Sequence, residues 1–339
     1  MTINRPKLAV VGVGRMGQLH LKKCLELSDK IELIGFFDPS PQQARLVREQ
    51  YQVTAFEDLS RLFFEADAVV IASNTPTHFS LARDALSAGL HVLIEKPMTE
   101  TLAQAEELIG LAHRNQVNLQ VGFLERYRLR ALTQGLDLSS PVFIEANRLA
   151  TVVGREPEVD VFADLMIHDL DLALSLVQGQ LSKVSSVAGR VSTDYFDVAM
   201  VQMEFDDGSI VRLNASRVAP LPQRTFKVHA GDKIADLNFA TNSSQLSQRA
   251  AGELNCQTVS VEAFDALREQ LLDFVTGYSI GRRPVVSGED GLKVLRFVSL
   301  LQQEASTRSF ASPLSVRDRN PHEALVAPRM ALPPSVPRE

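Results

Sequence analysis

The chain has 339 residues, of which 45% are hydrophobic and 22% charged, and its net charge at neutral pH is −6. This length predicts two domains of ordinary size, and the composition is that of a folded globular protein. The acidic balance argues against nucleic acid as a partner. The longest apolar runs are far shorter than the roughly 20 residues that cross a bilayer, so we expect no membrane span.

The chain has only two cysteines, Cys24 and Cys256, and they do not form a C-x-x-C pair. A zinc cage cannot be assembled from them, so no metal site is expected. Such sparing use suits a reducing compartment, although the count alone does not exclude one disulfide. Residues 1–7 lack the charged and apolar segments of a secretory signal, so we expect a cytoplasmic protein.

In the first 125 residues, short β-branched apolar runs alternate with longer helical patterns. This rhythm is typical of β-α-β units and of a parallel sheet buried on both faces. The predicted strands are Lys7–Val11, Ile31–Phe37, Ala68–Ala72, His91–Ile94 and Asn118–Gly122, and the predicted helices are Met16–Leu27, Gln42–Gln50, Thr77–Ala88 and Leu102–Asn115.

The rhythm changes after residue 125, where extended runs follow one another with few helices between them. This order predicts an α+β domain with a large, mostly antiparallel sheet and helices on one face. The predicted helices are Glu125–Gln134, Val161–Val177, Glu262–Tyr278 and Glu289–Glu304, and the predicted strands are Val142–Ala150, Val184–Val191, Val198–Phe205, Ser209–Ser216, Thr225–His229 and Ile234–Phe239. We therefore expect domains over residues 1–123 and 124–311, followed by a Pro-rich tail over 312–339.

A G-x-G-x-x-G segment connects the first predicted strand to the first predicted helix. Its residues are Gly12, Val13, Gly14, Arg15, Met16 and Gly17. The glycines allow a tight turn, a close approach to a pyrophosphate and close packing of helix on strand, and the helix N-terminus attracts phosphates. In this context the segment predicts a Rossmann doubly wound sheet that binds a dinucleotide.

Asp38 follows the second predicted strand, about 20 positions after Gly17. A carboxylate at this place accepts hydrogen bonds from the ribose hydroxyls of NAD and repels the 2′-phosphate of NADP. Residues 39–41 bring no arginine, whereas Arg45 and Arg48 are the first cations that could reach such a phosphate. NAD is therefore the expected cofactor.

Three further polar segments follow predicted strands or lie on the long second-domain helix. They contain Ser73, Asn74, Thr75, Pro76 and His78; Glu95, Lys96 and Pro97; and Asp164, His168, Asp169 and Asp171. In this order, and together with the glycine loop, they resemble the glucose-fructose oxidoreductase / inositol dehydrogenase / MocA family over residues 5–306. The resemblance implies that the first two segments bind the cofactor and that Lys96 lies next to the nicotinamide and the reacting hydroxyl.

On an α-helix, Asp164, His168 and Asp171 would share one narrow stripe, whereas the rest of that helix is apolar. Such a stripe is either a solvent face or the wall of a cleft, and the family uses this histidine. Oxidation of a secondary alcohol needs a proton acceptor and a cation near the developing alkoxide. His168 can be the acceptor with Asp164 as its orienting group, or Lys96 can be the acceptor with His168 as a relay. The sequence does not choose between these two assignments. It also offers no partner for Asp169.

The variant around Asp164 looks most like the subgroup that oxidises the 3-hydroxyl of UDP-N-acetylglucosamine on the way to a 3-amino sugar of lipid A-type glycolipids. The candidate substrate-binding residues are Arg126, Tyr127, Arg148, Arg155 and Asp171, the arginines as partners of a diphosphate. The alternatives are an inositol or free-sugar dehydrogenase and, in another class, a non-catalytic NAD-binding sensor or scaffold.

The predicted strand Val198–Phe205 is apolar in both of its alternating sets of side chains. One set is expected to face the helices. An apolar sheet face that no helix covers is commonly buried against another subunit, so we expect a homodimer or homotetramer formed through the second-domain sheet.

Overall fold

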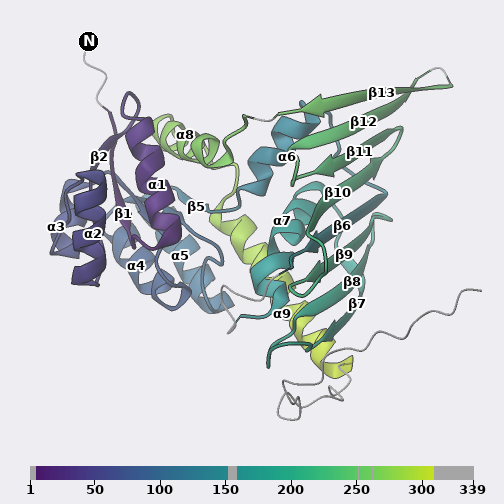
Figure 1. Ribbon diagram of the computed structural model, residues 1–339, viewed down its shortest axis with the longest axis horizontal. Coiled ribbons are helices and arrows are strands. Elements are labelled where there is room, and N and C mark those ends of the chain that lie inside the picture. Colours follow the sequence, from purple (N-terminus) through teal and green to yellow (C-terminus); the bar gives the residue numbers. More distant parts are fainter. Residues whose placement is uncertain (1–4, 152–158, 251, 262, 309–339) are drawn as a thin grey trace, which may run out of the picture.

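The computed structural model describes residues 5–151, 159–250, 252–261 and 263–308, and its first half is built around a five-stranded parallel sheet of order β2-β1-β3-β4-β5 (Figure 1). The strands are β1 (Lys7–Val11), β2 (Glu32–Phe37), β3 (Ala68–Ile71), β4 (His91–Ile94) and β5 (Leu119–Val121). The helices are α1 (Arg15–Glu26), α2 (Pro41–Tyr51), α3 (Leu59–Glu65), α4 (Thr75–Ser87) and α5 (Leu102–Asn115). The predicted doubly wound sheet is confirmed. Only α3 was not predicted, because seven residues are too few to show a helical period.

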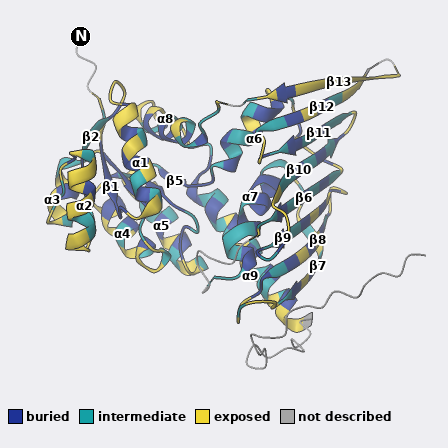
Figure 2. Ribbon diagram, viewed as in Figure 1, coloured by how far each residue is buried: buried dark blue, intermediate teal, exposed yellow. Residues whose placement is uncertain are grey.

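The second half contains an eight-stranded sheet of order β13-β12-β11-β10-β6-β9-β8-β7. The strands are β6 (Phe143–Leu149), β7 (Leu181–Gly189), β8 (Val198–Phe205), β9 (Ile210–Ser216), β10 (Gln223–Ala230), β11 (Lys233–Asn238), β12 (Ser243–Ala250) and β13 (Glu253–Ser260). All neighbouring pairs are antiparallel except β6 and β9, so the predicted sheet type is confirmed. The sequence prediction missed β12 and β13. β13 is exposed along nearly its whole length (Figure 2), so it lacks the apolar alternation that marks a half-buried strand.

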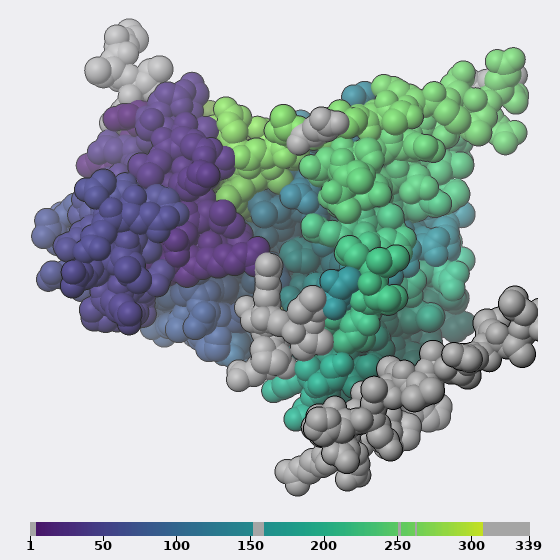
Figure 3. Space-filling view, viewed as in Figure 1, coloured from purple at the N-terminus to yellow at the C-terminus, as the bar shows by residue number. Residues whose placement is uncertain are grey.

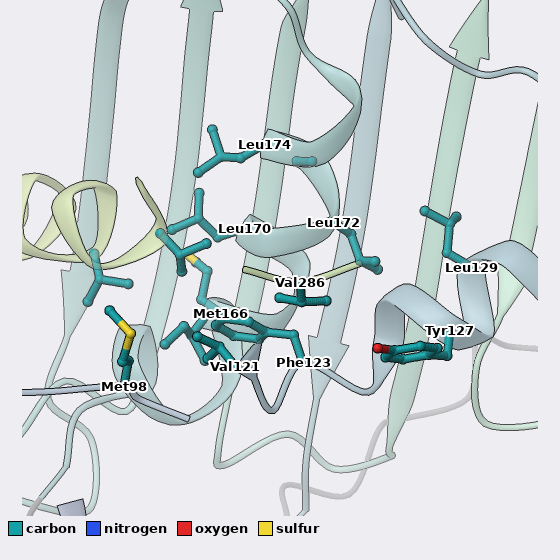
Figure 4. Packing of buried hydrophobic residues seen from close by; sticks show 14 of the residues in the cluster. Met98, Val121, Phe123, Tyr127, Leu129, Met166, Leu170, Leu172, Leu174 and Val286 are labelled. Atoms are coloured by element: carbon teal, nitrogen blue, oxygen red, sulfur yellow. The ribbon is translucent and has the colours of Figure 1, made fainter. Parts of the chain in front are cut away.

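Helices cover one face of this second sheet. They are α6 (Glu125–Thr133), α7 (Ile167–Leu176) and α9 (Gly288–Arg308). In β8, residues 199, 201, 203 and 205 are buried on that side, whereas Met200 on the other side is 58% exposed. α7 lies between the two sheets (Figure 1), and its side chains Leu170 and Leu174 form one row with Met166, the residue before α7, near Phe123 (Figure 4).

The helix α8 (Ala266–Ser279) returns to the first sheet, although it lies inside the range expected for the second domain. Its side chains Leu271, Phe274 and Val275 share a buried cluster with Leu8 and Val10 of β1. The next helix, α9, packs against α5 of the first half and α7 of the second. After its first passage from β5 to α6, the chain therefore crosses twice more between the two parts that Figure 3 shows in purple and in green, and these crossings hold the parts together.

The structure also shows the state of the two cysteines and allows the helices to be searched for a membrane span. Cys24 is buried, Cys256 is exposed, and both are free thiols. Within the described ranges, no helix is long and apolar enough to cross a membrane. The expected tail over 312–339 lies outside the described residues.

The burial of the helix-facing side of the second sheet predicts how a substitution there changes stability. Phe226 in β10 is fully buried, so Phe226→Ala should lower the free energy of unfolding by about 3–5 kcal/mol through lost burial and the cavity left behind. The matched control is Phe64→Ala, because Phe64 is 90% exposed and its loss should change the free energy by less than about 0.5 kcal/mol. Urea unfolding measures both; equal effects would contradict the packing described above.

Candidate active site

The glycine loop lies at the carboxyl end of β1, where the sheet order reverses between β2 and β3. Gly12 has a φ of +84°, and a Cβ there would lie 2.6 Å from the backbone nitrogen of Ser73. A Cβ on Gly17 would lie 1.9 Å from the carbonyl oxygen of Gly12. At Gly14, by contrast, a Cβ would meet no atom within 4 Å. The loop is therefore tightly packed at Gly12 and Gly17, whereas the space beside Gly14 is open.

The first turn of α1 leaves its backbone N–H groups free for an anion. Gly14 is the N-cap and offers no side-chain acceptor, and the first turn contains no acidic residue. Exposed N–H groups and the partial positive charge of a helix N-terminus suit a phosphate. The open space at Gly14 and this helix end fit the pyrophosphate of a dinucleotide.

Asp38 lies directly after β2, beside the glycine loop. Its Oδ2 accepts a hydrogen bond of 2.9 Å from the Val13 N–H, and its Oδ1 accepts one of 2.9 Å from the Ser40 N–H. These two bonds fix the carboxylate and leave lone pairs for ribose hydroxyls. Arg45, one of the two cations that could have favoured NADP, is paired with Glu49 on the exposed face of α2.

The segment after β3 is connected to the segment after β4 by His78. Its Nδ1 lies 2.9 Å from the carbonyl oxygen of Pro97, and its Nε2 lies 3.0 Å from that of Ser73. The imidazole is 1% exposed, and burial lowers its pKa. His78 therefore supports the loops expected to bind the cofactor from behind. Ser73 also contacts Thr77 through its hydroxyl group, at 2.7 Å.

A buried pair precedes Lys96. Glu95 Oε1 lies 2.8 Å from His20 Nε2, and both side chains are buried. A Cβ at Gly122 would lie 2.8 Å from Glu95 Oε2, so the end of β5 passes closely over this carboxylate. Sequence reasoning did not select His20. A histidine on the buried face of α1 was the available signal, but a single polar residue on an apolar face does not reveal its partner.

Lys96 connects the two halves of the molecule. Its Nζ donates a hydrogen bond of 3.2 Å to the backbone carbonyl of Asp164 and lies 4.0 Å from the Asp164 carboxylate. Asp164 belongs to a π-helical turn, Phe162–Met166, that precedes α7. The predicted helix Val161–Val177 is present, but its first turn is π-helical and not α-helical. A π turn is wider than an α turn and is often found at functional sites.

His168 is partly buried in the first turn of α7, and its ring lies edge-on to Phe123 at 6.3 Å between centroids. Its Nδ1 is buried and has no hydrogen-bond partner among the described residues, so Asp164 does not orient the imidazole through this nitrogen. The π turn alters the α-helical spacing on which that expectation depended. Burial, and then the positive charges of Lys96 and nearby arginines, lower the pKa of His168 well below its ordinary value. This shift favours the neutral imidazole, which is the form that accepts a proton.

The predicted polar stripe does not continue along α7. Asp171 is fully buried, and Arg126 donates two hydrogen bonds of 2.8 Å to its carboxylate. Burial raises the pKa of Asp171 to about 6, against the opposing effect of Arg126. The expected stripe is wrong here because a buried ion pair hides Asp171. Its expected contact with substrate, like that of Arg126, stays a prediction.

Arg148 is buried and supplies the missing partner of Asp169, to which it donates two hydrogen bonds of 2.8 Å. The Tyr127 hydroxyl donates a hydrogen bond of 2.7 Å to Asp273 of α8. Arg155 lies outside the described residues. The structure thus brings Lys96, Asp164 and His168 together, whereas Arg126 and Arg148 are neutralised by carboxylates of α7.

No group of three or more histidine, cysteine or acidic side chains within the described ranges could hold a metal ion. The polar groups at the junction of the two sheets include a lysine, a histidine of lowered pKa and a carboxylate. This donor set is suited to moving a proton and to stabilising an alkoxide.

Comparison with known proteins agrees with this geometry. A model of the Gfo/Idh/MocA oxidoreductase family, NAD-binding Rossmann fold, matches residues 7–123, and one of the C-terminal domain of the family matches residues 152–233. The UDP-N-acetylglucosamine 3-dehydrogenase of Acidithiobacillus ferrooxidans is 33% identical over 312 residues, which cover 90% of this chain and 98% of that protein. Its solved structure has a TM-score of 0.83 over 89% of this chain and 98% of its own.

Two further relatives are more distant. The myo-inositol 2-dehydrogenase of Thermotoga maritima is 26% identical over 92% of this chain and 98% of its own length. A levoglucosan dehydrogenase solved with NADH is 17% identical and covers 90% of this chain and 98% of its own, with a TM-score of 0.80, which shows a shared fold.

Fold, site and relatives together define an NAD-dependent oxidoreductase of the sugar dehydrogenase type, acting on a CH–OH group. The chain belongs to the glucose-fructose oxidoreductase / inositol dehydrogenase / MocA family.

Because the space beside Gly14 is open, a substitution there should weaken cofactor binding without changing folding stability. Gly14→Ala should leave the unfolding temperature unchanged, because the added methyl meets no protein atom, but should crowd the pyrophosphate. An overpacking cost of about 1–3 kcal/mol corresponds to a rise in the NAD dissociation constant of roughly 5- to 150-fold. Calorimetric titration with NAD measures this. Gly110→Ala, where the new Cβ meets only a flexible arginine side chain, is the control and should bind NAD normally; an unchanged constant for Gly14→Ala would rule out this phosphate site.

Proposed function

We propose that this enzyme oxidises the 3-hydroxyl of UDP-N-acetylglucosamine to a 3-keto sugar for the synthesis of a 3-amino sugar of lipid A-type glycolipids. The observation that carries the proposal is the meeting of Lys96 and Asp164 across the two sheets, next to a neutral His168. The A. ferrooxidans relative, which is named for this reaction and aligns over nearly its whole length, supports the choice of substrate.

The proposed chemistry assigns different tasks to Lys96 and His168. When NAD is bound, its nicotinamide ring supplies the hydride acceptor. His168 takes the proton of the reacting hydroxyl, which its lowered pKa permits at neutral pH. Lys96 Nζ has donors beyond the one bound by the Asp164 carbonyl, and these stabilise the negative charge that develops on the reacting oxygen.

Lys96 as proton acceptor, with His168 as a relay, is the alternative assignment on the same residues. The inositol dehydrogenase of T. maritima supports a second candidate substrate, a free polyol. A non-catalytic NAD sensor is disfavoured, because a sensor needs the dinucleotide pocket but has no use for an alcohol-oxidising pair.

We also propose that two copies of this chain associate through the outer face of the second sheet, as a homodimer or as part of a homotetramer. Val187 and Met200 are partners in the β7–β8 register, and both are largely exposed on this face. Burial of such an apolar pair between subunits would remove it from water. A cytoplasmic location, in keeping with two free thiols, is part of the same proposal.

Purified protein with NAD should oxidise UDP-N-acetylglucosamine, followed as NADH absorbance with a coupled aminotransferase to withdraw the keto product. Lys96→Met and His168→Asn should each lower kcat by about 10²–10⁴-fold while NAD still binds, because they remove a proton-transfer or charge-stabilising group. Lys30→Met and His113→Asn, two exposed positions, are the matched controls. The enzyme proposal fails if neither UDP-N-acetylglucosamine, myo-inositol nor glucose is oxidised despite tight NAD binding.

The pH dependence distinguishes the two proton acceptors. A base works in its unprotonated form, and the pKa of His168 lies well below 6.5, so kcat/KM should stay constant from pH 8 to pH 6.5 and fall only at lower pH. An unshifted imidazole would lose about half of its basic form at pH 6.5. If kcat/KM already declines above pH 8 as the pH is lowered, the proton acceptor is instead an amine.

A further inference from the structure

Three arginines converge on one carboxylate beside the active site. Glu125, at the start of α6, accepts hydrogen bonds from Arg224 of β10 and from Arg148 of β6, the latter at 3.4 Å. Arg128, one turn further along α6, lies 3.7 Å from the other oxygen of the same carboxylate. We call Glu125, Arg128, Arg148 and Arg224 the arginine cluster.

The cluster carries more positive charge than the folded chain neutralises. Arg148 and Arg224 are direct partners in the antiparallel register of β6 and β10, and like charges at such positions repel each other. Asp169 binds the guanidinium of Arg148 through two hydrogen bonds, and Glu125 is shared by all three arginines. Three cations therefore face two carboxylates, so an additional anion would stabilise the group.

Two of the three arginines retain donors for such an anion. Arg148 is buried and saturated by carboxylates, whereas the side chains of Arg224 and Arg128 are 38% and 26% exposed. The Nε of Arg128 is buried and has no hydrogen-bond partner among the described residues. Planar guanidinium groups bind the oxygens of phosphate through paired hydrogen bonds.

The arginine cluster adjoins the residues that would carry out the reaction. Asp169, the partner of Arg148, follows His168 directly on α7. Glu125 follows Phe123, whose ring packs edge-on against His168, by two positions. The charges of Arg148, Arg224 and Arg128 are close enough to act on the imidazole. An anion bound here and a hydroxyl at His168 can therefore belong to one molecule.

We propose that Arg128 and Arg224 form an anion subsite of the substrate pocket, which binds a phosphate group of a nucleotide-activated sugar while Glu125 and Arg148 hold the two guanidinium groups in place. This inference rests on the proposed function and specifies how its substrate is recognised. It also explains how a chain of net charge −6 attracts a dianionic sugar nucleotide, since the attraction is local. A sugar carboxylate would use the same donors, so the test includes one.

The test compares substrates with and without phosphate on single-arginine variants. Arg224→Gln and Arg128→Gln should each raise KM for UDP-N-acetylglucosamine about 10–100-fold, the loss expected for charge-assisted hydrogen bonds, with kcat within about 3-fold. KM for neutral N-acetylglucosamine and myo-inositol should not change. Calorimetry should show that UDP binds the wild-type protein and binds the variants at least about 10-fold more weakly. Arg61→Gln removes an exposed charge on α3 and is the matched control.

Further variants separate binding from folding. Arg224→Lys keeps the charge but loses the planar fork, so its KM should lie between those of the wild type and Arg224→Gln. Equal losses for charged and neutral substrates, or a loss confined to kcat, would show a purely structural role and overturn the inference. If the variants raised KM for glucuronate but not for UDP-N-acetylglucosamine, the subsite would bind a carboxylate and not a phosphate.

Failure of the anion subsite is distinguishable from failure of the proposed function. A wild-type enzyme that oxidises neutral sugars, does not bind UDP and is unaffected by Arg224→Gln is a dehydrogenase without this subsite. A wild-type protein that binds UDP through Arg128 and Arg224 but oxidises no sugar has the subsite and lacks the activity.

Discussion

The hydrogen bond from Lys96 to the backbone of Asp164 is the contact on which the site depends. Lys96 lies just beyond the carboxyl end of β4, and Asp164 lies in the π turn that begins α7. The bond brings together an edge of the parallel sheet and a helix that packs on the antiparallel sheet. Because the carboxyl ends of parallel strands meet at one edge, the glycine loop, Asp38 and the segments after β3 and β4 reach the same place.

Burial of charge is the second constraint on this structure. α7 is largely apolar, yet it carries Asp169 and Asp171 inside the protein. Each carboxylate is bound by an arginine through two hydrogen bonds, since an unpaired buried charge would cost several kcal/mol. These ion pairs connect α7 to α6 and β6, and they hold His168 between an aromatic ring and a group of cations. The same packing keeps its imidazole neutral.

Sequence patterns predicted the architecture well where a period or a turn motif was strong. The strands of the first sheet and the glycine loop were visible because buried parallel strands are continuous apolar runs and because the loop requires glycine. β12 and β13 were missed because both are rich in polar residues, and β13 is also exposed along nearly its whole length. The π-helical first turn of the long helix was not foreseen, because a π turn differs from an α turn in its hydrogen bonds and the residue pattern does not show them.

The sequence by itself determined the order of the elements, the dinucleotide loop and the identity of Lys96, Asp164 and His168 as candidate residues, since these depend on local spacing and on residue type. Only the tertiary structure decided which charges are available. Arg126 and Arg148 look like free cations in the sequence but are bound by Asp171 and Asp169, whereas Arg128 and Arg224 retain donors. The physical reason is that packing between elements far apart in the chain determines which carboxylate pairs with each arginine. Local sequence patterns do not show which distant elements are in contact.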